Sequence, residues 1–201
     1  MSGIFDRNVP GSTEVLQRAT VGIAGCGGLG SNAALSLARA GVGRMILADP
    51  DVVEESNLNR QQFFREEIGR RKVDSLAARL RSVNPAIGVE THAIELTPAE
   101  VPRIFADAQV LIEAFDRAER KAWLIESWCR AFPDRLIVVA SGLSGLGRTN
   151  ALRVRRSGRI VFCGDETSEM TEGLCAPRVT IVANMLANVA VEWLVNGTVT
   201  C

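Results

Sequence analysis

The chain has 201 residues, of which 47% are hydrophobic and 23% charged, and these proportions predict a single globular domain over residues 1–201 rather than a disordered or fibrous protein. Its 23 Lys and Arg residues balance its 23 Asp and Glu residues, so no overall basic field favours binding to nucleic acid or to a membrane surface. Any site for an anion must therefore be local.

The first ten residues mix polar and apolar side chains. They include the acidic Asp6 and lack the apolar segment that a secretory signal needs, so the sequence predicts a cytoplasmic protein.

A βαβ unit is the first regular structure that the pattern predicts. Residues 20–25 (TVGIAG) form a short apolar run that ends in glycine, which is typical of a strand before a tight turn. Residues 28–40 follow with apolar side chains at helical spacing, and residues 44–49 (RMILAD) form a second apolar run that ends in an acid. Together they predict strand, glycine-rich turn, helix and strand.

The alternation continues along the chain. The patterns predict a helix over 70–83, strands over 89–94 and 109–114, a helix over 117–131 and a strand over 136–141. Such alternation implies a parallel sheet covered by helices. The runs 148–156 and 159–163 flank a Ser-Gly turn typical of a hairpin, so we expect a Rossmann-like α/β fold whose sheet is extended by antiparallel strands in its second half.

A long apolar helix is predicted over 178–196. Asn184, Asn188 and Glu192 lie within it and argue against a membrane span, so we interpret it as a buried helix. Its broad apolar face needs a partner surface, which favours a homodimer.

The five cysteines are widely spaced and odd in number, which favours free thiols over a disulfide framework. No C-x-x-C pair occurs and His92 is the only histidine, so a four-ligand zinc site is not expected. His92, on a modest strand, is more typical of a surface or packed residue than of a ligand.

The turn after the first strand reads Gly25-x-Gly27-x-x-Gly30, and Asp49 ends the next strand. This is the dinucleotide-binding fingerprint in its expected context: the glycines let the backbone approach a phosphate at a helix N-terminus, and the acid accepts hydrogen bonds from ribose hydroxyls. The fingerprint predicts an adenosine nucleotide and leaves NAD and ATP both open.

Further motifs match no dehydrogenase pattern. They are Ser56-Asn57-Leu58-Asn59-Arg60-Gln61, Lys72-Val73 after Gly69, Asn84-Pro85, Glu113-Ala114-Phe115-Asp116 and Cys175-Ala176-Pro177-Arg178-Val179. With the glycine-rich turn, they resemble the ThiF/MoeB/HesA family of ubiquitin-activating-like adenylyltransferases, most of all the short ThiF-like branch linked to thiamine biosynthesis. The resemblance runs from about Phe5 to the end of the chain.

The resemblance implies a set of site residues. Asp49 is expected to bind the ribose, Arg60 and Lys72 the triphosphate, and Asp116 a magnesium ion. The nucleotide site as a whole would comprise Gly25, Gly27, Gly28, Gly30, Asp49, Asp51, Asn57, Arg60, Gln61 and Lys72.

Two further residues have implied roles in catalysis. Arg7 would match an N-terminal arginine that reaches the nucleotide of a partner subunit. Cys175 would match a cysteine that some relatives link covalently to the carrier or to a sulfur donor, although a small residue beside Ala176 and Pro177 is commonly only packed.

The implied reaction suits these residue types. A terminal carboxylate, with a pKa near ~3.5, is already ionised at neutral pH. Its attack on the α-phosphorus of ATP needs alignment and neutralised triphosphate charge rather than a general base. We therefore expect an enzyme that uses ATP and magnesium to adenylate the C-terminal glycine of a ThiS-like sulfur carrier, with any sulfur supplied by a separate persulfide donor.

Other functions remain open at this point. The same chemistry could act on a molybdopterin-type carrier or on a small-molecule carboxylate, and the chain could also be a nucleotide-binding module without turnover. An NAD-dependent oxidoreductase has support only from Gly25 to Asp49.

Overall fold

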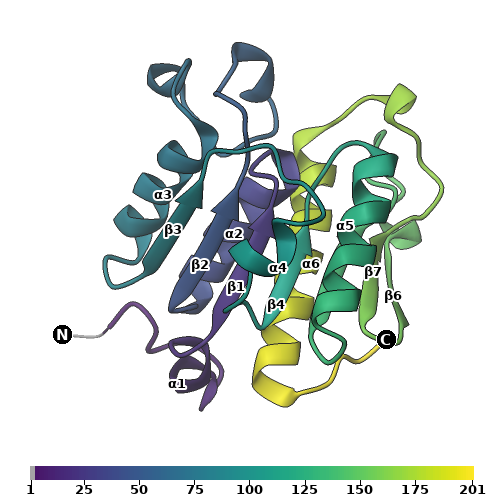
Figure 1. Cartoon of the computed structure of the whole chain (residues 1–201). Coiled ribbons are helices and arrows are strands. Elements are labelled where there is room, and N and C mark those ends of the chain that lie inside the picture. The colour runs from purple at the N-terminus through teal and green to yellow at the C-terminus, as the bar shows by residue number, and fades with distance from the viewer. Residues whose placement is uncertain (1–2) are drawn as a thin grey trace.

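In the computed structural model, which describes residues 3–201, a central sheet lies between two layers of helices (Figure 1). The seven strands are β1 (Thr20–Ala24), β2 (Arg44–Ala48), β3 (Gly88–His92), β4 (Val110–Glu113), β5 (Leu136–Ala140), β6 (Arg153–Ser157) and β7 (Ile160–Gly164). The helices within the described residues are α1 (Ser12–Leu16), α2 (Gly28–Ala40), α3 (Lys72–Val83), α4 (Val101–Ile104), α5 (Ala118–Ala131) and α6 (Ala176–Asn196).

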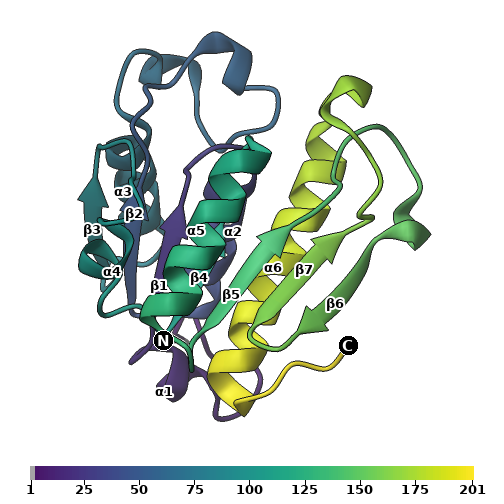
Figure 2. The ribbon, with the colours of Figure 1, turned by 45° about the vertical axis from the view of Figure 1, so that its right-hand side comes forward.

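The strands are ordered β3-β2-β1-β4-β5-β7-β6. All neighbouring pairs are parallel except β6 and β7, which form the antiparallel hairpin at one edge of the sheet (Figure 2). The chain leaves β1 toward β2 on one side and returns to β4 on the other, so the strand order reverses between β1 and β4. In sheets of this type, ligands bind outside the carboxyl ends of the strands at that reversal.

Each face of the sheet has its own core. On one face, α2, α3 and α6 cover apolar side chains of the parallel strands, among them Ile23, Leu47 and Val138, and Val89 of β3 packs at the margin of this core. On the other face, α4 and α5 cover a smaller cluster around Trp128 and Phe105. Because the central strands are buried on both faces, they read as continuous apolar runs rather than as alternating patterns.

The predicted α/β fold is confirmed, with differences at the edges. The strand expected from residue 148 begins only at Arg153, because Arg148 has a left-handed φ of 48° and residues 149–151 form a 3-10 turn. Of the two strands in the hairpin only β6 is antiparallel, since β7 runs parallel to β5. The short helices α1 and α4 were not predicted, because they are too short to show a periodic apolar face.

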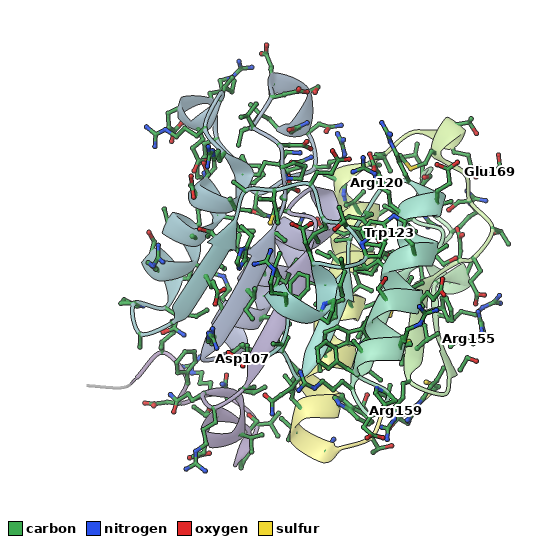
Figure 3. All side chains as sticks on the ribbon, in the orientation of Figure 1. Asp107, Arg120, Trp123, Arg155, Arg159 and Glu169 are labelled. Atoms are coloured by element: carbon green, nitrogen blue, oxygen red, sulfur yellow. The ribbon has the colours of Figure 1, made fainter. Side chains whose placement is uncertain are left out.

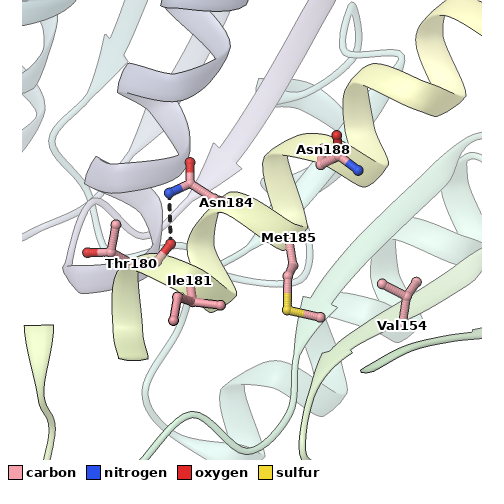
Figure 4. A pocket seen from close by; sticks show the side chains of 6 residues that line it. All are labelled: Val154, Thr180, Ile181, Asn184, Met185 and Asn188. Atoms are coloured by element: carbon pink, nitrogen blue, oxygen red, sulfur yellow. Dashed lines mark hydrogen bonds between the residues drawn. The ribbon is translucent and has the colours of Figure 1, made fainter. Parts of the chain in front are cut away.

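Among the described residues, α6 is the one helix long and apolar enough to cross a membrane by length and composition. It lies against α2 and the sheet, and eight of its residues, Val182 and Leu186 among them, are buried. The opposite side is open. There, Ile181 and Met185 line a shallow hollow with Val154 of β6 and three polar residues of the helix, with a volume of ≈ 410 Å³ (Figure 4).

Candidate functional site

The glycine-rich turn joins β1 to α2 at the carboxyl edge of the sheet. Gly25 has a φ of 98°, and a Cβ there would lie 2.7 Å from the carbonyl oxygen of Ala114, which follows β4. A Cβ on Gly30 would lie 1.8 Å from the carbonyl oxygen of Gly25. The first glycine therefore permits the turn beside β4, and the last lets α2 begin directly against the turn.

A cleft of ≈ 730 Å³ opens at this edge. Its walls come from the segments that follow β1, β2, β4 and β5, so it lies at the reversal of strand order between β1 and β4. Ten of the predicted site residues line it, namely Gly25, Gly27, Gly28, Asp49, Asp51, Asn57, Arg60, Gln61, Lys72 and Asp116. Gly30 lies behind the turn and is not among the lining residues.

Asp49 connects β2 to the glycine-rich turn. Its Oδ2 accepts a hydrogen bond from the backbone N–H of Cys26 at 2.6 Å, and its Oδ1 accepts one from the N–H of Asp51 at 2.8 Å. Burial raises the pKa of the Asp49 carboxyl above its ordinary value, and these two hydrogen bonds oppose that rise. The carboxylate is thus fixed in place at the mouth of the turn.

Lys72 is the first residue of α3, and only 7% of its side chain is exposed. Its ammonium lies 2.7 Å from Oδ2 of Asp51, and its backbone N–H donates to the carbonyl of Asp51 at 3.0 Å. The Asp51 side chain is 61% exposed, so the lysine is the buried partner of the pair. This geometry holds a positive charge in the cleft wall.

The segment after β2 carries Asn57, Arg60 and Gln61. Asn57 is buried, and its Oδ1 accepts from the N–H of Glu54 at 3.1 Å. Arg60 donates from Nη1 to the carbonyl of Ser56 at 3.0 Å and to Oδ1 of Asn59 at 2.7 Å. Gln61 is buried, and its Oε1 is enclosed by protein and has no hydrogen-bond partner among the described residues.

Asn32 of α2 holds this segment against the helix. Its Nδ2 donates to the carbonyl oxygens of Arg60 at 3.0 Å and Gly28 at 2.6 Å. Its Oδ1 accepts from Nε2 of Gln62 at 2.7 Å and from Oγ1 of Thr180 at 3.3 Å. One buried amide therefore joins α2, the Arg60 segment and α6.

Glu113, the last residue of β4, is fully buried. Its Oε2 lies 2.7 Å from Nζ of Lys121, and its Oε1 accepts from the N–H of Phe115 at 2.7 Å. Burial raises the pKa of the Glu113 carboxyl, and the charge and hydrogen bond of Lys121 oppose that rise. Asp116 follows in this loop, is exposed, and makes no hydrogen bond or ion pair with another residue of 3–201.

On the far wall, two loops are tied to the start of α6. Arg178 and Asp165 form an ion pair with side-chain exposures of 3% and 1%, and Arg178 also donates to the carbonyl of Gly147. Asp165 accepts from the N–H groups of Thr167 at 2.9 Å and Ser168 at 2.8 Å. Burial alone would raise the pKa of Asp165, but these hydrogen bonds and that of Arg178 outweigh it and hold the pKa well below its ordinary value.

Besides Gly30, the structure places two predicted residues outside the cleft. Arg7 is exposed in the segment before α1, where the neighbouring Asn8 donates to the carbonyl of Ala40 at 2.9 Å. Ala40 ends α2, whose 13 residues span about 20 Å from the glycine-rich turn, so Arg7 lies at the opposite edge of the sheet from the cleft of its own chain. Cys175 is the N-cap residue of α6, half-buried and absent from the lining, although Leu174 beside it does line the cleft.

Several residues of the site escaped the sequence analysis. Lys121 and Arg120 line the cleft from α5, and Figure 3 labels Arg120. Glu113 and Arg178 belong to motifs that carry the family resemblance. No sequence pattern indicated that either residue forms a buried ion pair. Lys121 is 8 residues from Glu113 along the chain, and Arg178 is 13 residues from Asp165, so only the fold brings each pair together.

The cleft therefore presents fixed cations, a fixed carboxylate and a glycine-rich helix start. Within residues 3–201 there is no group of three or more His, Cys, Asp or Glu that could hold a metal ion. The arrangement suits a polyanion that the cleft binds and orients.

The sequence matches the ThiF family over residues 5–200. Among curated proteins, it is 47% identical over 102 residues to adenylyltransferase and sulfurtransferase uba4 of Emericella nidulans, a segment that covers 50% of this chain and 21% of that protein. It is 42% identical over 129 residues to adenylyltransferase and sulfurtransferase MOCS3 of Bos taurus, covering 64% and 28% respectively. The chain thus matches well under a third of the length of these relatives.

Solved structures share the fold over nearly the whole chain. The E. coli tRNA N6-threonylcarbamoyladenosine dehydratase TcdA in complex with AMP has a TM-score of 0.81 at 24% identity and covers 91% of this chain and 88% of its own. E. coli MccB with ATP has a TM-score of 0.75 at 21% identity and covers 93% and 59%. These likenesses confirm the Rossmann-like architecture.

Proposed function

This chain belongs to the ThiF family, and from that premise we propose that it is an adenylyltransferase, which uses ATP to convert a C-terminal glycine carboxylate into an acyl adenylate with release of pyrophosphate. The observation that carries the proposal is the cleft, where the glycine-rich turn and Asp49 stand beside the cations of Arg60 and Lys72. A pyridine dinucleotide needs no such pair of cations, whereas a triphosphate does.

The cleft as a whole fits ATP in size and chemistry. A volume of ≈ 730 Å³ is within the range of nucleotide and drug-sized pockets, about 300–1,000 Å³. Asp49 is fixed where it can accept from ribose hydroxyls, and Gln61 lines the same cleft. The TcdA and MccB structures with AMP or ATP support testing this ligand first.

The residues around the cleft supply charge and position, which is what the reaction requires. An ionised carboxylate, with a pKa near ~3.5 for a chain terminus, needs no base before it attacks the α-phosphorus. Arg60 and Lys72 would hold the triphosphate, and Asn57 would contact its phosphates. Binding energy then goes into aligning the carboxylate with the phosphorus and neutralising the leaving pyrophosphate.

Asp116 suits a magnesium ion that is bound mainly by the nucleotide. Magnesium is usually bound by one or two protein carboxylates, with water and phosphate oxygens as its other ligands. The one exposed carboxylate of Asp116 in the cleft agrees with this coordination. When bound, the ion would neutralise phosphate oxygens. The proposal does not extend to an all-protein metal site.

For the acceptor we propose a small ubiquitin-like sulfur carrier, with a ThiS-like carrier of thiamine biosynthesis as the first to test. The relatives named adenylyltransferase and sulfurtransferase support an acceptor of this class, and they widen the panel beyond thiamine biosynthesis to carriers of the uba4 and MOCS3 kind. TcdA is named for a modified tRNA nucleoside, so non-protein carboxylates belong in the panel as well.

Three further parts of the proposal concern assembly, sulfur transfer and location. A homodimer would bring Arg7 of one subunit toward the cleft of another, which agrees with its distance from the cleft in its own chain. Cys175 would act, if at all, in sulfur transfer after adenylation, with a persulfide protein as donor. A cytoplasmic location remains a prediction from composition.

The test is ATP–pyrophosphate exchange with this panel of carriers and carboxylates. We expect exchange that depends on one acceptor and on magnesium, and that falls about 10²-fold or more in Lys72→Ala and Asp116→Ala. Arg130→Ala is the control, because Arg130 is 79% exposed on α5 and pairs only with Glu126 in the same helix. Tight NAD binding without detectable ATP binding, or wild-type exchange in both cleft variants, would overturn the proposal.

A further inference from the structure

The chain has only two lysines, and both lie at the same cleft. Lys72 and Lys121 are the only lysines in the sequence, and the remaining positive side chains among the 23 Lys and Arg residues are arginines. Both lysines line the cleft. Each is paired with a carboxylate at 2.7 Å, Lys72 with Asp51 and Lys121 with Glu113.

The two lysines approach the cleft from different sides. Lys72 starts α3, and its carboxylate partner follows β2. Lys121 lies in the first turn of α5, and its partner ends β4. Because β1 stands between β2 and β4 in the sheet, the glycine-rich turn separates the two charges.

The Lys121 ammonium has one N–H donor that is not used within residues 3–201. Its ammonium donates to Oε2 of Glu113 at 2.7 Å and lies 3.4 Å from the carbonyl oxygen of Ala140, the last residue of β5. An ammonium carries three N–H donors and accepts nothing, so one donor remains, and 22% of the side chain is exposed at the cleft. Glu113, fully buried, keeps the charge in place.

The wall around Lys121 differs from the nucleotide wall. Ser141, Gly142 and Ser144 follow β5 and line the cleft beside it with small side chains. The residues suited to ribose and triphosphate, Asp49 and Arg60 among them, stand on the other side of the glycine-rich turn. Arg120 also lines the cleft from α5 but pairs with Glu95, and Asp116 is assigned to magnesium in the proposed function. The serine hydroxyls and the directed ammonium of Lys121 fit the end of an extended chain that carries a carboxylate.

We propose that Lys121 is a substrate-binding residue that holds the carboxylate of the acyl substrate, while Lys72 serves the nucleotide. The inference rests on the proposed adenylylation and adds a residue to it. The contact is a charge-assisted hydrogen bond from the third N–H of Lys121 to a carboxylate oxygen, and Glu113 fixes the direction of that bond.

Because the chain has only two lysines, selective amine acetylation read by mass spectrometry can follow each one separately. The probes are ATP with magnesium, a synthetic peptide that ends in a Gly-Gly carboxylate, and the same peptide with a C-terminal amide. We expect ATP to slow acetylation of Lys72, and the carboxylate peptide to slow acetylation of Lys121 about threefold or more, with no effect of the amide. This readout needs neither turnover nor a variant.

Other labelling results would overturn the inference. Protection of Lys121 by ATP alone would assign Lys121 to the phosphates. Equal protection by the acid and amide peptides would remove the carboxylate contact. No protection by either peptide at saturating concentration would make Lys121 structural.

Exchange kinetics provide the second arm. In Lys121→Gln the KM for the acyl substrate should rise about tenfold or more while the KM for ATP stays within about twofold, and Lys121→Arg should restore most of the loss. If Lys121 had only a structural role, Lys121→Gln would instead lower the melting temperature and kcat, and neither KM would change selectively. If no acceptor supports exchange in the wild type, adenylylation itself fails, while the labelling result still decides whether Lys121 binds a carboxylate.

Discussion

The buried ion pair between Arg178 and Asp165 offers the sharpest test of how the far wall of the cleft is held. Arg178 lies in the first turn of α6, and Asp165 follows β7, so the pair joins the helix to the loop that carries Ser168. Through the carbonyl of Gly147 it also holds the loop after β5. Replacing Arg178 with Met keeps much of the side-chain volume and removes the charge.

The expected loss follows from burial. Side-chain exposures of 3% and 1% mean that neither group can be compensated by water once its partner is gone. Removing one partner of such a pair costs about 3–5 kcal/mol, because the other charge stays buried and unpaired. For a domain of this size 1 kcal/mol shifts the melting temperature by about 2–4 °C, so Arg178→Met should melt roughly 6–20 °C lower.

Thermal and urea unfolding of Arg178→Met and Arg130→Met measure the difference. Arg130 and Glu126 are 79% and 67% exposed at i,i+4 spacing, so that pair should contribute only about 0.3–0.5 kcal/mol. The pKa of Asp165 is lowered in the folded state, so its contribution to stability is present above the unfolded pKa of about 3.9 and is lost as the pH falls below it. The difference in free energy of unfolding between wild type and Arg178→Met should therefore become smaller as the pH falls into the acid range. A loss under about 1 kcal/mol at neutral pH would refute the reasoning.

Three other substitutions test the turn, its support and the thiol. Gly30→Ala should destabilise the fold by several kcal/mol, measured by urea unfolding, because a Cβ would lie 1.8 Å from the carbonyl oxygen of Gly25. Asn32→Asp should raise the KM for ATP about tenfold in the exchange assay, since a carboxylate cannot donate to the carbonyl of Arg60. Cys175→Ser should leave exchange within about twofold of wild type, because the thiol does not line the cleft.

Matched controls separate these effects from general damage. A Cβ on Gly88 meets no atom closer than 3.5 Å, so Gly88→Ala should cost under about 1 kcal/mol. Ser36 bonds Asn184 across the same pair of helices that Asn32 joins, without reaching the Arg60 segment, so Ser36→Ala should leave the KM for ATP unchanged. Equal effects of Ser36→Ala and Asn32→Asp, a stable Gly30→Ala, or loss of exchange in Cys175→Ser would contradict the respective assignments.

Much of the fold was predictable because local signals and the global fold agree. The helix expected over 28–40 is α2 to the residue, since a glycine-rich turn starts it and Gly41 in a left-handed conformation ends it. The central strands were visible as short apolar runs between turns. The start of β6 was misplaced because Arg148 adopts a left-handed conformation that nothing in a run of mixed polar residues indicates.

The site was predictable to the extent that its residues follow strand ends. Asp49 and Asp116 come after β2 and β4, and parallel strands bring such positions to one edge. The supporting contacts were not predictable, because Glu113 with Lys121 and Asn32 with Arg60 depend on how α5 and α2 pack on the sheet. A single sequence shows which side chains are polar, but the packing of helices on the sheet determines which of them form hydrogen bonds or ion pairs with one another.

The positions of the thiols favour a division between adenylylation and sulfur chemistry. Cys26 lies in the glycine-rich turn, but it is fully buried and does not line the cleft, and burial raises the pKa of its thiol well above the ordinary value. Burial likewise raises the pKa of Cys163 to about 12. A thiolate is the nucleophilic form, so both are inert near neutral pH. The proposed adenylylation therefore rests on charge in the cleft, and the half-buried Cys175 at the start of α6 is the thiol for which the proposed sulfur step remains to be tested.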